Sequence, residues 1–211
     1  MRQGRKQGAQ VSPRVDGRTA RAHRTRSAIL DALLDLIDRG TLQPTASAVA
    51  TQAGVALRSI RQHFESREVL FLAASERHAE RMVREQRASP RALVTEGPLD
   101  ERIRRFVEAR AHALEATSAI RRAAILRESS SAALSLALRT PARERRREVE
   151  RVFATELASR EPRERTSVLD ALDLDTSGKA WDTLRRDMSR SRADAAGVMA
   201  TAIHALANVA R

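Results

Sequence analysis

The sequence contains no cysteine and no tyrosine, and aromatic residues make up only 2% of it, with a single tryptophan. The absence of cysteine excludes disulfides, thiolate catalysis, cysteine-ligated metals and thiol-based redox sensing. Because aromatic side chains are so scarce, a core has to be built from Ala, Leu, Ile and Val at helical spacing. The composition therefore predicts an all-α protein.

Long apolar runs are also missing. No stretch approaches the roughly 18 uninterrupted apolar residues of a membrane span. The start, MRQGRKQGAQVSPRVDGR, has no apolar segment of the kind found in a secretory signal peptide. We therefore expect a cytoplasmic protein with no membrane partner.

Positive charge is what the chain has in excess. It carries 39 Lys and Arg against 27 Asp and Glu, which gives a net charge of +12 over 211 residues. Arginine supplies nearly all of the excess, and guanidinium groups bind phosphates in a bidentate manner. This indicates a nucleic-acid partner. A general preference for Arg over Lys, as in a high-GC genome, would explain much of the arginine content but not its local clustering.

The first 75 residues divide at glycines and at polar caps. Residues 1–17 are too polar and too rich in glycine to pack, and we expect a disordered basic arm. A helix is predicted from about Arg18, with an apolar stripe that ends at Gly40. A short helix follows the N-cap Thr45 and stops at Gly54, a third begins at about Leu57, and a longer one begins after Ser66.

The rest of the chain begins with a loop, RASPRALVTEGPLD, which contains two of the six prolines. Beyond it the pattern predicts helices near 99–115, 118–127, 130–160, 162–187 and 192–209, for a total of about nine. Thr140 and Pro141 are expected to kink or split the third of these, because proline fits best in a first turn. SRAD at 191–194 is a capping box for the last helix. No strand or internal repeat is predicted.

The stretch QAGVALRSIRQHF, residues 52–64, combines a glycine turn with a helix that is apolar on one side and rich in donors on the other. On a helical wheel Leu57, Ile60 and Phe64 fall together, and Arg58 and Gln62 point the opposite way. Such a helix pair is either a structural corner or a helix-turn-helix unit whose second helix enters the major groove. The basic arm and the overall charge favour the DNA-binding alternative.

The polar side chains of this helix suit different parts of DNA. Arginine pairs with guanine N7 and O6, and glutamine with adenine N6 and N7, so Arg58 and Gln62 are suited to base edges. The remaining donors are better placed for the flanking phosphates; these are Ser59, Arg61, His63 and the Thr45 hydroxyl.

The segment AILDALLDLIDRGTLQPTASAVATQAGVALRSIRQHFESREVLF resembles the N-terminal domain of the TetR family of bacterial transcription regulators. The match covers roughly residues 25 to 75 and includes the Gly40 turn, Thr45, AGV, HF and the start of the fourth helix. The resemblance implies a homodimer with a helix-turn-helix DNA-binding domain over 18–66 and a helical ligand-binding and dimerisation domain over 67–211, which follow the basic arm over 1–17.

Family roles can be carried over by position. Thr45 matches a phosphate-contacting cap, residues 57–63 match the recognition helix, and Arg67 matches a basic residue that meets the DNA backbone. Arg61 stands where the family usually has tyrosine, Leu57 replaces a frequent lysine, and Ser47 is often arginine in relatives. The predicted DNA-binding residues are Arg26, Thr45, Ser47, Leu57, Arg58, Ser59, Arg61, Gln62, His63 and Arg67.

The resemblance also implies a small-molecule pocket and a dimer interface in the C-terminal helices. Large or polar side chains at apolar positions are candidates for the pocket lining, with ordinary packing as the alternative; they are Phe106, Arg110, His112, Ile125, Trp181 and Met188. The dimer interface is expected on the last two helices, where the same stripe also serves as intrachain core. Its candidates are Leu169, Leu172, Val198, Ala202, Ile203 and Leu206.

The function that follows is a homodimeric repressor that a small molecule releases from a palindromic double-stranded DNA operator. The alternatives are an activator or ligand-independent regulator of the same fold, and a helical protein that binds nucleic acid without sequence preference. The five histidines lack metal-ligand spacing, and no phosphate loop or nucleophile elbow is present. We expect no enzyme activity, no metal and no cofactor.

The basic arm is either a tether to the minor groove or the phosphates, or a disordered extension with no role at a specific site. If it is a tether, deleting residues 2–17 is expected to weaken operator binding and to make its salt dependence shallower. The arm contains four basic residues, Arg2, Arg5, Lys6 and Arg14. Without them the protein neutralises fewer phosphates, so fewer counterions are released when it binds DNA. The measurement is a titration of operator DNA at several salt concentrations, with both chains compared side by side. If the slope of log affinity against log salt concentration is the same for both chains, the arm is not part of the DNA interface.

Overall fold

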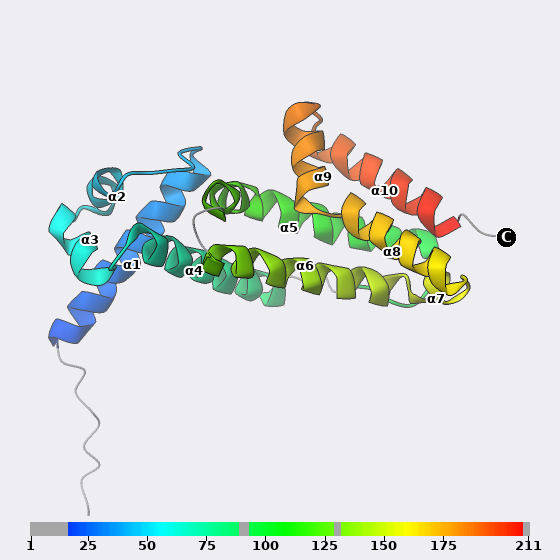
Figure 1. Cartoon of the computed structure of the whole chain (residues 1–211), viewed down its shortest axis with the longest axis horizontal. Coiled ribbons are helices and arrows are strands. Elements are labelled where there is room, and N and C mark those ends of the chain that lie inside the picture. The colour runs from blue at the N-terminus through cyan, green and yellow to red at the C-terminus, as the bar shows by residue number, and fades with distance from the viewer. Residues whose placement is uncertain (1–16, 89–92, 129–131, 209–211) are drawn as a thin grey trace, which may run out of the picture.

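The computed structural model describes residues 17–88, 93–128 and 132–208, and these are almost entirely helical. They form ten α-helices and one π-helical turn, with no strand in the described part of the chain. The all-α prediction is therefore confirmed. Figure 1 shows an elongated molecule in which α1, α2 and α3 occupy one end and α5 to α10 extend to the other, with α4 leading from the first group toward the second.

The first three helices are α1 (Gly17–Asp38), α2 (Ala46–Ala53) and α3 (Leu57–His63). The Thr45 hydroxyl accepts a hydrogen bond from the Ala48 N–H at 3.1 Å, and Gly54 ends α2 in the left-handed region at φ 65°. Gly40 follows α1 at φ 96°. The predicted caps are confirmed, because the groups that form them lie within four residues of one another in the sequence. The predicted arm lies outside the described residues except for Gly17, which begins α1.

Two long helices follow, α4 (Arg67–Ala88) and α5 (Leu99–Glu128). The Ser66 hydroxyl caps α4 by accepting from the Val69 N–H at 3.1 Å. The predicted break between residues 115 and 118 is wrong, because α5 runs through it. Neither glycine nor proline interrupts this stretch, and the Thr117 hydroxyl donates to the Ala113 carbonyl one turn back, so the helix continues.

The remaining elements are α6 (Ala132–Val152), α7 (Ala154–Ala158), α8 (Pro162–Asp175), α9 (Gly178–Asp182), the π-turn η1 (Thr183–Asp187) and α10 (Arg192–Asn208). The predicted helix over 130–160 breaks at Phe153 and not at Pro141, and Phe153 is a buried residue whose ring packs edge-on against Phe106. The predicted helix over 162–187 divides at Thr176, because the Ser177 hydroxyl caps α9. The predicted cap at Ser191 is confirmed: its hydroxyl accepts from the Asp194 N–H at 3.1 Å and donates to the Asp194 carboxylate at 2.7 Å.

The buried side chains form two clusters. The first joins α1, α2 and α3 but also includes Leu70 and Phe71 of α4 and Ile120 of α5. The second joins α5 through α10, with Trp181 and Phe153 among its largest members. Helix α5 contributes to both, so residue 66 does not separate two independent cores.

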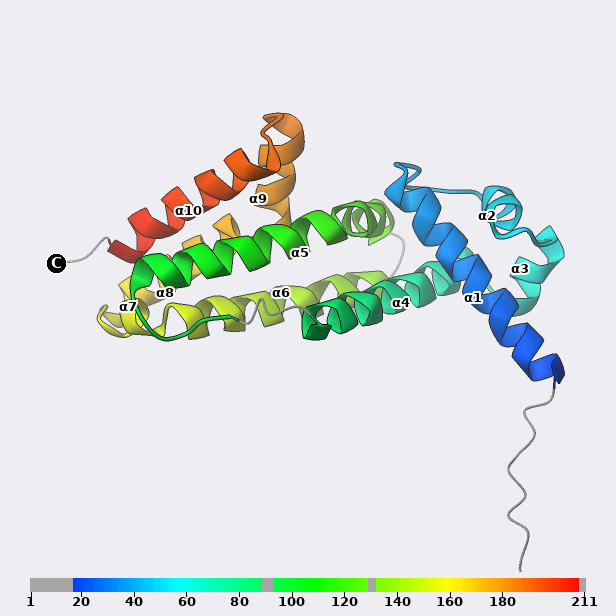
Figure 2. The ribbon, with the colours of Figure 1, turned by 180° about the vertical axis from the view of Figure 1, so that it is seen from behind.

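Helices α4 and α5 both pass beside α1 (Figure 2), and polar contacts join them to the α1–α3 unit. Arg77 of α4 forms a bidentate pair with Asp31 of α1 at 2.8 and 2.7 Å, and Arg81 reaches the same carboxylate at 3.1 Å. Arg127 at the end of α5 stacks 4.6 Å from the centre of the Phe71 ring and donates to the Leu42 carbonyl after α1. Helices α4 and α5 are therefore both attached to the α1–α3 unit.

Asp175 gives the fold a specific pH dependence. Burial raises the pKa of Asp175 to about 6, and its Oδ2 is buried without a hydrogen-bond partner in the described residues. The native state therefore holds a proton that the unfolded chain releases near pH 4. This stabilisation is present below about pH 4 and is lost as the pH rises through about 6. The loss is at most about 3 kcal/mol, and the partial solvent exposure of the side chain makes it smaller.

Asp175→Asn is expected to remove this decrease. The free energy of unfolding, measured with urea between pH 4 and 7.5, should fall more steeply in the native chain than in the variant. Asp35→Asn, a change at an exposed carboxylate of α1, is the control. Parallel curves for the native chain and Asp175→Asn would contradict the assignment.

Candidate functional site

Helix α3 has one buried face and one face that carries hydrogen-bond donors. Ile60 and the following Phe64 are buried in the first core cluster. Arg58, Arg61 and Gln62 are exposed, as the wheel predicted for this side of the helix. Because its inner face is fixed by packing on α1 and α2, α3 presents these donors on a rigid support.

Leu57 departs from the predicted pattern. Its side chain is 41% exposed, so it does not share the burial of Ile60 and Phe64. It is the first residue of α3 and lies beyond the edge of the small α1–α3 core. Ser59 and His63 are half-buried at the sides of the helix. Leu57 thus adds an apolar group to the outer surface, where it can contact a partner.

The start of α2 lies on an exposed part of the same unit. Thr45 and Ser47 are both exposed, and the Thr45 hydroxyl already accepts from the first turn of the helix. Arg67, at the start of α4, donates from Nη2 to the Pro44 carbonyl at 3.2 Å. Arg67 therefore holds α4 against the segment that begins α2.

Arg26 lies between α1 and α3. Its guanidinium carbon is 4.5 Å from the centre of the Phe64 ring, and its Nη1 is buried without a hydrogen-bond partner among the described residues. A groove of about 240 Å³ adjoins it, lined by Arg18, Thr19, Ala22, His23, Arg26 and His63. The groove brings Arg26 and His63 together. Arg18 and His23 were not among the predicted residues, although the basic first turns of this helix were a signal for them.

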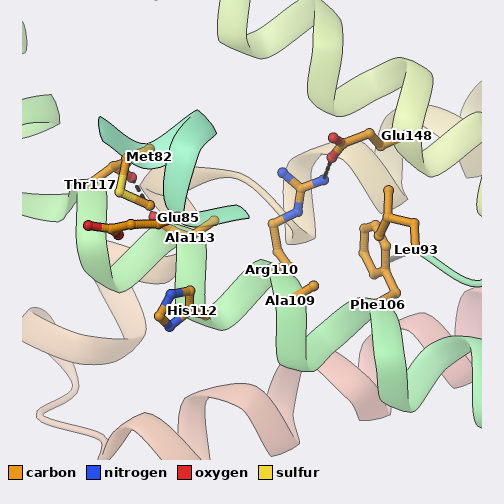
Figure 3. Close-up of a pocket in the computed structure, with 10 residues that line it drawn as sticks. All are labelled: Met82, Glu85, Leu93, Phe106, Ala109, Arg110, His112, Ala113, Thr117 and Glu148. Carbon is orange, nitrogen blue, oxygen red and sulfur yellow. Dashed lines mark hydrogen bonds and ion pairs between the residues drawn. The ribbon is translucent and has the colours of Figure 1, made fainter. Parts of the chain in front are cut away.

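A cavity of about 190 Å³ lies between α4, α5 and α6 (Figure 3). Three of the predicted pocket residues, Phe106, Arg110 and His112, line it. The remaining residues that line the cavity are Met82, Glu85, Leu93, Ala109, Ala113, Thr117 and Glu148. The sequence did not indicate Met82, Glu85 or Glu148, because which faces of α4 and α6 meet α5 depends on tertiary packing.

Arg110 is the central polar group of the cavity. Its Nη2 donates to Glu148 at 2.6 Å, and its guanidinium carbon is 5.1 Å from the centre of the Phe106 ring. Burial lowers the pKa of Arg110 from its usual range, and the Glu148 carboxylate opposes that shift. The cavity therefore combines apolar walls with a paired cation.

The other three predicted pocket residues do not line this cavity. Trp181 is 0% exposed in the second core cluster, and its indole Nε1 donates to Glu115 at 2.9 Å. Ile125 and Met188 are 52% and 57% exposed. The pattern placed Trp181 on an apolar face correctly, but packing against α5 fills the space around it.

The predicted dimer residues fall into two groups. Leu169, Leu172 and Ile203 are buried in the second core cluster, so they are not available to a partner. Val198 is 44% exposed, and Ala202 and Leu206 are half-buried. Val198 and Ala202 line a shallow surface on α10 with other small residues, Ala193, Gly197, Thr201 and Ala205.

Neither a metal site nor a membrane span is found in the described part of the chain. No group of three or more His, Asp or Glu side chains there is arranged to hold a metal ion. No described helix is both long and apolar enough to cross a bilayer. No protein-family model and no curated protein matches the chain.

Proposed function

We propose that the protein is a sequence-specific DNA-binding regulator of the TetR type, a cytoplasmic homodimeric repressor released from a palindromic operator by a small molecule. The observation that carries the proposal is the outward face of α3. Arg58, Arg61 and Gln62 are exposed there, while Ile60 and Phe64 fix the helix from beneath. A short helix that follows a glycine turn and presents such donors has the geometry required to read base edges in the major groove.

Phosphate contacts would hold α3 in the groove. The groove that contains Arg26 and His63 adjoins α3 on one side, and exposed Thr45 and Ser47 lie at the start of α2. Such contacts position a protein on DNA without carrying sequence information. The net charge of +12 adds a long-range attraction for DNA.

A dimer is part of the proposal, because one seven-residue recognition helix makes too few contacts for specific affinity. The exposed small and apolar residues of α10, including Val198, Gly197 and Ala202, allow another helix to approach closely. Leu174 of α8, a helix that packs against α10, is a second large apolar side chain at the surface and is 66% exposed. Two copies related by twofold symmetry would face a palindromic site.

Ligand release would act through α4. Met82 and Glu85 of this helix line the cavity, whereas Arg67 at its start holds the Pro44 carbonyl before α2. Asp31 binds two further arginines of α4. A ligand that binds the non-DNA conformation better shifts the population toward it, and a tenfold weaker operator affinity requires a difference of about 1.4 kcal/mol.

Footprinting on genomic fragments with competitor DNA tests the function. The protein is expected to protect one palindromic site with two half-sites about one helical turn apart. An activator or a ligand-independent regulator would protect such a site too, and transcription from the adjacent promoter with and without candidate ligands would distinguish them. If competitor DNA abolishes binding equally on every fragment, the protein is instead a nonspecific nucleic-acid-binding protein.

A further inference from the structure

The cavity between α4, α5 and α6 contains an arginine with unused hydrogen-bonding capacity. Arg110 has five N–H groups, and one of its nitrogens, Nη2, donates to a described residue, Glu148. Nε is buried with no hydrogen-bond partner in the described residues. Figure 3 shows the other terminal nitrogen pointing away from Glu148 and from Leu93. Because Nε is buried, a molecule in the cavity would meet the guanidinium at this other terminal nitrogen, Nη1, while Glu148 holds Nη2.

The charges around Arg110 disfavour an ionic ligand. Glu148 binds the guanidinium directly, and Glu85 lies at the rim, where its side chain is exposed. A ligand carboxylate would have to compete with Glu148 for Arg110 and would face two negative groups. A ligand ammonium would meet the Arg110 charge inside the cavity, and its attraction to Glu85 would be weakened by solvent.

The walls and the size of the cavity define the rest of the ligand. Met82, Leu93 and Phe106 supply apolar surface, with Ala109 and Ala113 between them. A cavity of about 150 Å³ holds benzene, which has six non-hydrogen atoms, so the volume of about 190 Å³ found here corresponds to about eight non-hydrogen atoms. A chain of two more atoms can extend past Glu85, whose side chain is exposed.

We propose that this cavity binds an uncharged small molecule that has an aliphatic body and a carbonyl oxygen accepting a hydrogen bond from Arg110. This inference names the class of molecule that the effector site would bind. Its meaning for regulation rests on the proposed function. The carbonyl satisfies a cationic donor without disturbing the pair with Glu148, and the aliphatic body covers the apolar walls. An ionised ligand could cover the apolar walls, but its charge would either compete with Glu148 for Arg110 or be repelled by Arg110.

Three probes of matched size test the ligand class on the full chain. Methyl heptanoate and octanoate have the same numbers of carbon and oxygen atoms, but only octanoate is charged, and octylamine carries the opposite charge. Isothermal titration calorimetry is expected to show methyl heptanoate binding at least about tenfold more tightly than either ion. Tighter binding of octanoate or of octylamine would overturn the proposal, and so would the absence of binding by all three.

Substitutions at Arg110 locate the contact. Arg110→Met keeps an unbranched apolar stem, although a shorter one, and removes the donors, and it is expected to weaken methyl heptanoate binding about tenfold or more. Arg110→Met leaves Glu148 unpaired, which could unfold the protein. The double variant Arg110→Met with Glu148→Gln removes this unpaired charge and allows the same binding measurement. Ile125→Ala, a change at an exposed residue of α5 outside the cavity, is the control and should bind as the native chain does.

A spectroscopic readout makes the test independent of folding effects and of DNA. The Nε–H signal of Arg110 in a nitrogen-15 spectrum is identified by its disappearance in Arg110→Lys, and it should shift when methyl heptanoate is added. Binding without such a shift would overturn the role of Arg110. If an operator is found and the ester does not bind, the proposed ligand class is wrong and the proposed function stands. If the ester binds and no operator is found, the proposed function fails and the binding site stands.

Discussion

Alanine at Arg58 or at Gln62 is expected to weaken operator binding by about 1 to 3 kcal/mol each and to relax the base preference at one position of each half-site. Both side chains are exposed on the outward face of α3, so their truncation removes base contacts without removing core packing. The double variant should combine the two effects, to the extent that the two residues contact different bases.

The measurement is operator affinity at fixed salt, together with a panel of operators that differ at single base pairs. Arg147→Ala removes the same charge as Arg58→Ala, but from an exposed position on α6 outside the proposed DNA-binding surface, and serves as the control for that variant. The same weakening on every sequence, with an unchanged base preference, would show that Arg58 and Gln62 contact phosphates and not bases.

Alanine at Trp181 is expected to have the largest effect on stability, about 3 to 5 kcal/mol. The indole is 0% exposed and belongs to the core cluster shared by α5, α6, α8 and α10. Its Nε1 donates to Glu115, which Arg185 also binds at 2.8 Å, and these contacts hold the pKa of Glu115 below its usual range. Truncation removes the apolar contacts and the hydrogen bond together.

Urea unfolding of Trp181→Ala and Trp181→Phe separates the two contributions. Phenylalanine keeps much of the buried volume and leaves Glu115 paired with Arg185, so its cost should be clearly smaller than that of alanine. A destabilisation below about 1 kcal/mol for alanine would indicate a site that collapses easily or is open to solvent, as a cavity-lining tryptophan would be.

The local features of this chain were predictable from its sequence. Thr45, Gly54 and Ser66 act on backbone groups a few residues away, so the ends of α2 and the start of α4 follow from neighbouring residues. The burial of Ile60 beneath exposed Arg58 follows from the helical period.

Other features that differ from the predictions have a different cause. The break at Phe153, the burial of Leu169 and the exposure of Leu57 each depend on which side chains arrive from distant parts of the chain. The cavity is the strongest case, since Met82, Arg110 and Glu148 come from three helices. No spacing within one helix indicates that these faces will meet.

The all-helical chain, the caps of its first helices and the donor-rich face of α3 all follow from the order of the residues, because a helical period and a capping residue act over a few positions. The tertiary structure alone decided that Trp181 fills the core, that α5 joins two clusters of buried residues, and that Arg110 stands paired with Glu148 in a cavity that α4 also lines. The two groups of features differ in the sequence distance over which they act. Capping hydrogen bonds form between near neighbours, whereas burial and cavities depend on contacts between helices that are far apart in the chain.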